Sequence, residues 1–143
     1  MAMNTNYKQD TVLLDHQTSV AANTASTTGS EVVDLRNRKG VASVVLLNHG
    51  VAEDTTGGRE GTFTTKIQTA SDTGFSADTA DVDTFTAISM DSDDTSVAAS
   101  VQDKALDLAA CERYLRVVTE GDTGNDAECT TDWTCVLNVN EAY

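Results

Sequence analysis

Gly61-Thr-Phe-Thr-Thr-Lys-Ile-Gln-Thr-Ala70 is the stretch that indicates the fold most directly. Its side chains alternate between apolar and polar, so that Phe63 and Ile67 share one face. The opposite face holds polar residues: Thr64, Lys66 and Gln68. A period of two is typical of a strand with one buried face. We therefore expect residues 62–70 to form a strand whose polar face points to solvent.

Other stretches extend this pattern along the chain. Residues 31–35 and 113–119 alternate in the same way. Residues 41–51 are apolar on both faces, which predicts a strand that is central in its sheet or covered on both sides. Residues 133–139 alternate again with Trp133 on the apolar face, where we expect it in the core. We expect residues 133–139 to form a hairpin with residues 113–119.

Weaker signals fill the middle of the chain. We expect an acidic loop over residues 75–83, then strands over 85–90 and 96–101. Residues 103–111 fit one or two helical turns, or an irregular edge strand. With turn residues at roughly ten-residue intervals, these signals predict an all-β fold. We expect an antiparallel β-sandwich or a jelly-roll-like barrel with about seven or eight short strands.

The 143 residues are most simply one domain, long enough to bury a core. Residues 1–28 are polar and rich in Thr, Ser, Asn and Ala. We interpret them as an N-terminal arm that is ordered against a neighbour. The alternative is a plain first strand of the domain, and the residues leave both open. Residues 29–143 are the predicted β domain.

The net charge of −14, from 9 basic and 23 acidic residues, limits the partners. It disfavours nucleic acid, whose phosphates need Lys and Arg clusters. It also disfavours an anionic membrane surface. No stretch approaches the roughly 20 apolar residues that span a bilayer, and no secretion signal is visible, so synthesis in the cytoplasm is expected. The acidity indicates a soluble acidic surface, or a marine or halophilic setting.

The sequence shows no catalytic motif and no cofactor motif. There is no G-x-S-x-G elbow, and no P-loop lysine follows Gly57-Gly58. Three cysteines, Cys111, Cys129 and Cys135, match no zinc or redox spacing. They are buried or surface thiols, or one disulfide with a leftover thiol. We expect no enzyme, no cofactor and no metal.

Two acidic turns raise the question of calcium. One contains Asp91, Asp93 and Asp94, and the other contains Asp78, Asp81 and Asp83. The first has the spacing that begins an EF-hand loop, but the required glycine and the terminal glutamate are absent. We interpret both groups as solvated turn acids.

Basic residues gather in two short segments of this acidic chain: Arg36, Arg38 and Lys39 in one, and Arg113 and Arg116 in the other. One interpretation is local pairing with the abundant acids. The other is docking onto an acidic partner surface, because arginine forks suit carboxylates.

Three motifs in fixed order resemble a known family. They are Val33-Asp-Leu-Arg36, then Gly61-Thr-Phe-Thr-Thr-Lys-Ile-Gln68 followed by Ser71-Asp72, then Arg113-Tyr-Leu-Arg-Val-Val118. This series resembles the small head decoration, or cement, proteins that tailed phages encode beside the major capsid protein. The resemblance covers roughly residues 31–139. Here the acidic turn reads Ser71-Asp-Thr-Gly74, and Glu112 stands where the family has a basic residue.

The resemblance implies a structural virion protein, made in the host cytoplasm, that binds the capsid exterior and stabilises it. The major capsid protein is the implied partner. A homo-oligomer is expected, and clustering at capsid axes favours a trimer. Two alternatives are a carbohydrate- or receptor-binding β module on a virion or cell surface, and a low-copy head or tail completion protein. The binding module would need exposed aromatic residues, for which the chain offers Tyr7, Tyr114, Trp133 and Tyr143.

Overall fold

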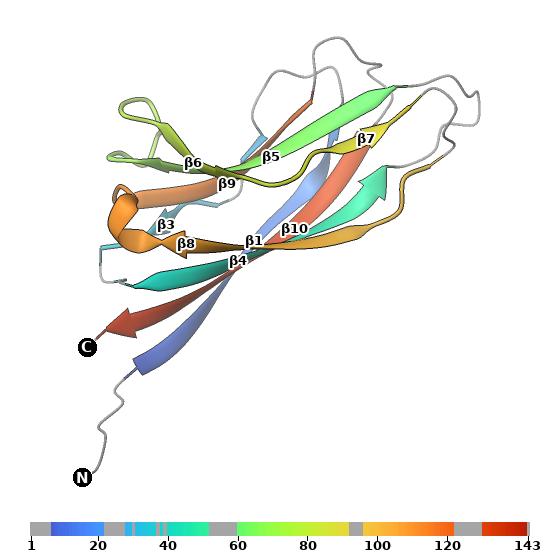
Figure 1. Ribbon diagram of the computed structural model, residues 1–143. Coiled ribbons are helices and arrows are strands. Elements are labelled where there is room, and N and C mark those ends of the chain that lie inside the picture. Colours follow the sequence, from blue (N-terminus) through green and yellow to red (C-terminus); the bar gives the residue numbers. More distant parts are fainter. Residues whose placement is uncertain are drawn as a thin grey trace.

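The computed structural model describes residues 7–21, 28–29, 31–36, 38, 40–51, 60–91, 96–121 and 130–142. For residues 7–21, 28–29, 51, 130 and 140–142 it describes the backbone alone. The described residues form ten strands in two sheets that stack face to face (Figure 1). Every strand pairing is antiparallel. The fold is therefore the predicted all-β sandwich, and seven of its strands have five or more residues.

The first sheet has four strands in the order β1 (Tyr7–Ala21), β10 (Thr130–Ala142), β4 (Val41–Val51) and β8 (Ser100–Asp107). The apolar run over residues 41–51 is thus an interior strand, as its composition predicts. Only one face of β4 is fully covered, however. Ala42, Val44 and Leu46 are buried between the sheets, whereas Val41 on the other face is 61% exposed.

The second sheet is built around β5 (Gly61–Ala70) and β9 (Tyr114–Gly121), which pair along most of their length. Short strands flank this pair: β2 (Thr28–Gly29) and β3 (Val33–Asp34) beside β9, and β6 (Ala80–Thr84) and β7 (Ile88–Met90) beside β5. The three sequence motifs therefore meet in one sheet, because β3, β5 and β9 carry them.

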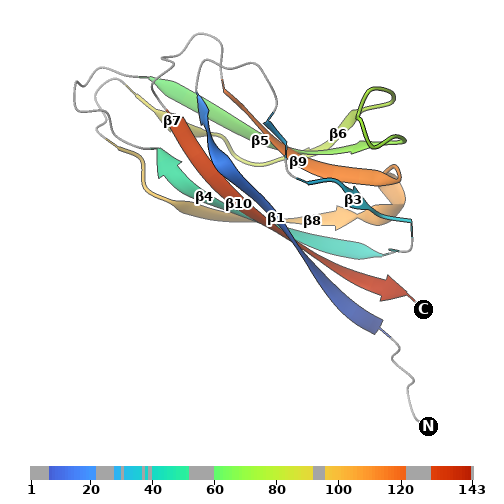
Figure 2. The same cartoon turned by 180° about the vertical axis from the view of Figure 1, so that it is seen from behind.

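The first strand runs beside the last. β1 pairs with β10 from Tyr7 opposite Ala142 to Ala21 opposite Thr130, and the two lie side by side in both views (Figures 1 and 2). Pairing within the chain agrees with a plain first strand for residues 7–21. Residues 1–6 and 22–27 lie outside the described residues, so the boundary at residue 28 stays a prediction.

The predicted hairpin of residues 113–119 with 133–139 is wrong. β9 pairs with β2, β3 and β5, whereas β10 lies in the other sheet between β1 and β4. Both strands have the expected alternation, but they lie in different sheets. A period-two pattern reports which face is buried and does not report which strand lies alongside.

In the middle of the chain the strands lie elsewhere than the sequence predicts: β6 (Ala80–Thr84) begins inside the predicted acidic loop of residues 75–83, and β8 begins at Ser100 rather than at residue 96. Of residues 85–90 only Ile88–Met90 is strand, and Phe85 is buried just outside it. Residues 103–111 combine the two alternatives, because edge strand β8 ends in a 3₁₀ turn, η1 (Leu108–Ala110). The Asp107 carboxylate begins this turn by accepting a hydrogen bond from the Ala109 N–H at 2.9 Å.

The main core fills the space between the sheets. Trp133, Cys135, Leu137 and Val139 point into it from β10, which confirms both the alternation of that strand and the core position of the tryptophan. Burial raises the pKa of the Cys135 thiol to about 12. A second, smaller cluster of Phe63, Ile88 and Met90 lies beyond the main core.

Candidate docking site

Asp34 contacts one arginine from each of the two basic segments. Its carboxylate accepts two hydrogen bonds from the Arg113 guanidinium, at 3.3 and 3.0 Å, and lies 3.4 Å from Arg36 Nη2. The position of Asp34 is fixed because β3 pairs with β9, which places it opposite Tyr114. One carboxylate thus holds two guanidinium groups, and the trio keeps a net charge of +1. Arg36 is the more open of the two, with 61% of its side chain exposed.

Arg116 is held by neutral groups. It lies across from Gln68 on β5, and its Nε and Nη2 donate to Gln68 Oε1 at 3.1 and 2.9 Å. Its guanidinium also stacks 4.2 Å from the centre of the Phe75 ring. Desolvation lowers the pKa of Arg116, which nevertheless stays charged at neutral pH. None of the described carboxylates forms an ion pair with it.

The loop after β5 supplies the Phe75 ring. The Asp72 carboxylate accepts backbone hydrogen bonds from Gly74 at 2.8 Å and Ala77 at 2.9 Å, so it closes the loop on itself. Hydrogen bonds from Ala77 and then Ser76 lower the pKa of Asp72. Phe75 sits at the tip with φ of 52° and is buried. The turn that the sequence predicts at residues 71–74 therefore places the Phe75 ring against the Arg116 guanidinium.

A polar network continues from Arg116 across three strands. Gln68 Nε2 donates to Asp81 Oδ1 on β6 at 2.7 Å, and Lys66 lies 3.4 Å from the same carboxylate. Lys66 also contacts Glu120 at 2.8 Å, and this hydrogen bond is the main reason that its pKa is raised. The expectation that Gln68 points to solvent is wrong, since Gln68 is buried. The loop over residues 71–79 and the neighbouring side chains of Arg116 and Asp81 cover Gln68. The alternation of apolar and polar residues along a strand does not show such cover.

The arginine edge is the name we give to Arg36, Arg113 and Arg116, which lie around the start of β9. Of the five basic residues predicted for docking, Arg113 and Arg116 have guanidinium groups held by two hydrogen bonds each, whereas Arg36 makes one 3.4 Å contact with Asp34 and is largely exposed. Arg38 is half-buried, and its N–H bonds to the Leu35 carbonyl at 2.9 Å. Lys39 lies outside the described residues. With Asp34 included, the arginine edge keeps a net charge of +2 in a chain of net charge −14.

The acidic turns form no common site in the described residues. Asp81 pairs with Lys66, Asp83 pairs with Lys104 at 3.2 Å, and Asp78 accepts a hydrogen bond from the Ser71 hydroxyl. Residues 93 and 94 lie outside the described part. Within that part, no three His, Cys, Asp or Glu side chains converge as metal ligands do. Cys111 and Cys135 are free thiols, and Cys129 lies outside the described residues.

Of the four aromatic residues considered for a carbohydrate platform, the structure describes the side chains of two. Trp133 is fully buried, and Tyr114 is half-buried beneath the Arg113 guanidinium at 4.7 Å. The Tyr7 side chain and Tyr143 lie outside the described residues. The two described rings therefore do not form an exposed stacking surface.

Comparison with protein-family models and with curated proteins finds no match to this chain. In the described residues, no helix combines the length and the hydropathy that a bilayer crossing requires. The features of this protein that bear on its function are therefore the fold, the arginine edge and the three motifs.

Proposed function

We propose that this protein is a structural virion component that binds the outside of an assembled capsid and stabilises it. The observation that carries the proposal is the arginine edge: guanidinium groups held in place on an acidic β-sandwich. Fixed guanidinium forks lose little conformational entropy on binding carboxylates. The acid-rich remainder of the surface keeps the free protein soluble and limits self-association through other faces.

The motif order supports the same proposal. The three motifs that resemble decoration proteins carry the arginine edge itself, since Arg36 follows β3, Arg113 and Arg116 flank the start of β9, and Gln68 on β5 holds Arg116. The proposed partner is an acidic surface of the major capsid protein. Binding only to the assembled shell would stabilise it by mass action. A trimer at the capsid axes remains part of the proposal.

The test is co-sedimentation of the purified protein with mature capsids from the source of the sequence, with copy number measured by quantitative gel. Arg36→Gln is compared with Ala105→Asp, an exposed change that gives the same net charge of −15. We expect saturable wild-type binding at hundreds of copies per particle. Arg36→Gln should weaken it about tenfold and Ala105→Asp should leave it nearly unchanged.

Other outcomes redirect the assignment. Binding at only six or twelve copies would favour a low-copy head or tail completion protein. No binding at any salt concentration, with a folded β spectrum, would overturn the proposal and favour the receptor-binding alternative. Equal weakening by both substitutions would show that net charge matters and that the arginine edge does not dock.

A further inference from the structure

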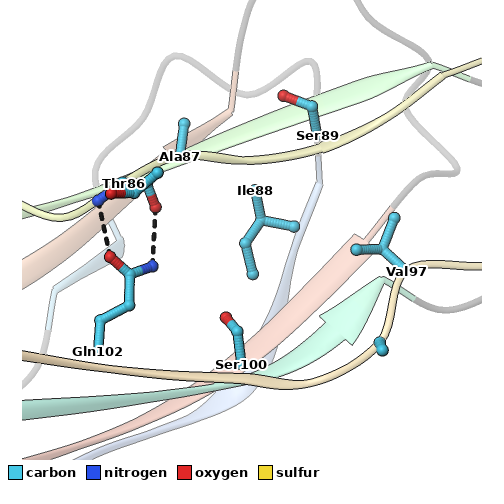
Figure 3. Close-up of a pocket in the computed structure, with 8 residues that line it drawn as sticks. Thr86, Ala87, Ile88, Ser89, Val97, Ser100 and Gln102 are labelled. Atoms are coloured by element: carbon cyan, nitrogen blue, oxygen red, sulfur yellow. Dashed lines mark hydrogen bonds between the residues drawn. The ribbon is translucent and has the colours of Figure 1, made fainter.

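One side of the sandwich is closed by side chains that reach from β8 to the edge of the other sheet. Lys104 pairs with Asp83 at 3.2 Å. Two residues along, the Gln102 carboxamide accepts from the Thr86 N–H at 2.8 Å and donates to the Thr86 carbonyl at 2.9 Å (Figure 3). These two bonds are the ones that a residue of a neighbouring antiparallel strand would make. Gln102 thus takes the place of a main chain at this edge.

Beyond Gln102 the seam opens into a cleft of about 450 Å³. Val97 supplies apolar surface and packs against the small cluster that contains Ile88, which is itself buried, and Ser100 lies at the base (Figure 3). Eight residues line the cleft, and none carries a charge. In a chain with 32 charged residues among 143, a neutral cleft selects against charged occupants. Its size is within the range of sites that hold small ligands and peptide segments.

The N–H and carbonyl groups of successive residues in β7 point alternately toward β5 and away from it. The Phe85 N–H donates to the Thr65 carbonyl at 2.9 Å, so Thr65 presents its main-chain groups to the β6 and β7 side. Phe63, two residues earlier, does the same, and it lies opposite Ile88. Ile88 therefore directs its main-chain groups to β5, and the next residue, Ser89, directs its own away from β5. Among the described residues β7 pairs with β5 alone, so the Ser89 N–H and carbonyl point to the side of β7 that no described strand occupies.

Ser100 adds a polar group with no partner. Its hydroxyl oxygen is buried and makes no hydrogen bond to the described residues. Buried hydroxyl groups without a partner are uncommon, because each costs free energy. Because this oxygen is buried, an occupant of the cleft does not reach it, and Ser100 shapes the base of the cleft without bonding to the occupant.

We propose that this cleft binds an extended, uncharged polypeptide segment, which adds a strand along the β7 edge. The segment bonds to the Ser89 main chain, and one of its apolar side chains packs against Val97. Strand addition of this kind takes affinity from main-chain bonds and specificity from alternate side chains. The inference depends on the cleft alone and is independent of the proposed capsid role.

The test is titration of ¹⁵N,¹³C-labelled protein with the capped peptide Thr-Val-Thr-Val-Thr, followed by NMR up to about 5 mM peptide, a range that suits weak binding. We expect shifts at the Ser89 amide and at the Ile88 and Val97 methyl groups. The capped peptide Thr-Val-Pro-Val-Thr, which lacks the central N–H, should bind about tenfold more weakly. Asp-Val-Asp-Val-Asp should be excluded to a similar degree.

Two variants test the cleft directly. Ala98→Asp places a charge at an exposed lining position and should weaken binding about tenfold, whereas Ala109→Asp on η1 should not. Ser100→Ala should leave binding nearly unchanged while the melting temperature stays equal or rises, because a buried hydroxyl without a partner is removed. Absence of shifts, equal binding of the proline peptide, or shifts confined to the outer face at Leu47 and Val101 would overturn the proposal.

Discussion

Gly50 shows how tightly one residue can be constrained in this molecule. Its φ is +92°, and a Cβ there would overlap the carbonyl oxygen of Val97. The Asn48 side chain accepts the Gly50 N–H at 2.8 Å, and the Thr131 hydroxyl lies 2.7 Å from the Gly50 carbonyl. Both Asn48 and Thr131 are buried. The end of β4 is therefore joined to β10 through polar side chains and packed against the chain that enters β8.

Gly50→Ala should destabilise the fold, because it combines an unfavourable φ with a backbone overlap. Gly40→Ala is the matched control, since Gly40 has φ of +86° with nothing within 4 Å of its Cβ position. We expect Gly40→Ala to cost about 1–2 kcal/mol from the φ alone. Gly50→Ala should cost about 2–3 kcal/mol more, from overpacking. Urea denaturation measures the free energy of unfolding of both variants. Equal losses in the two would show that the backbone near Val97 moves to accommodate the added Cβ at little cost.

Single residues also mark how far the sequence predicts the site. Arg113 and Arg116 are recognisable as basic residues in an acidic chain, and their strand is predictable from alternation. Their partners are not, because Asp34 and Gln68 lie 79 and 48 positions away in the chain. Gln68 looks like any solvent-facing residue of a strand until the Phe75 loop covers it. Burial of a polar residue depends on tertiary cover, which local periodicity does not encode.

At the scale of elements, the two sheets are joined differently along their edges. Hydrogen bonds of the backbone hold each sheet, but between edge strand β8 and the β6–β7 edge the contacts are Lys104 with Asp83 and Gln102 with Thr86. The sequence predicts β8 only as one of two alternatives. Its neighbours are unpredictable because strand order depends on long-range packing rather than on pattern. The side-chain seam is a consequence of that order and could not be foreseen.

The two hydrogen bonds between Gln102 and Thr86 should contribute to the stability of the seam. Gln102→Glu keeps an acceptor for the Thr86 N–H but removes the donor to the Thr86 carbonyl, and Gln102→Ala removes both. We expect a loss of about 1 kcal/mol for the glutamate and about 1–2 kcal/mol for the alanine. Hydrogen exchange should separate the two, because the Thr86 amide stays protected in Gln102→Glu and exchanges faster in Gln102→Ala.

Asp103→Asn is a suitable control for the seam variants. Asp103 is the adjacent residue of β8 and is exposed, so its substitution should leave the exchange of the Thr86 amide unchanged, and its effect on stability should be at most the small gain that the loss of one surface acid gives at low salt. If Gln102→Ala leaves that amide protected, the Gln102 carboxamide does not close the seam.

For the whole molecule, the charge balance is the dominant electrostatic feature. The chain carries 23 acidic and 9 basic residues, so the acids outnumber by 14 the basic groups that could pair with them one to one. The remaining carboxylates repel one another across the surface. Compaction brings them closer than they are in the unfolded chain, so repulsion destabilises the folded state. Added salt screens the repulsion, and it also weakens the ion pairs, which contribute less because they remain partly open to solvent.

The melting temperature should therefore rise with salt. Between about 0.01 M and about 1 M NaCl the Debye length falls from about 30 Å to about 3 Å, and each kcal/mol of repulsion removed should raise the melting temperature by about 4 °C. A variant with Glu60→Gln, Asp103→Asn, Glu112→Gln and Asp132→Asn has a net charge of −10 instead of −14, and all four positions are exposed. It should melt higher than wild type at low salt and show a smaller rise. Scanning calorimetry of both proteins across the salt series decides the matter, because a melting temperature that falls as NaCl is added would mean that the ion pairs outweigh the repulsion.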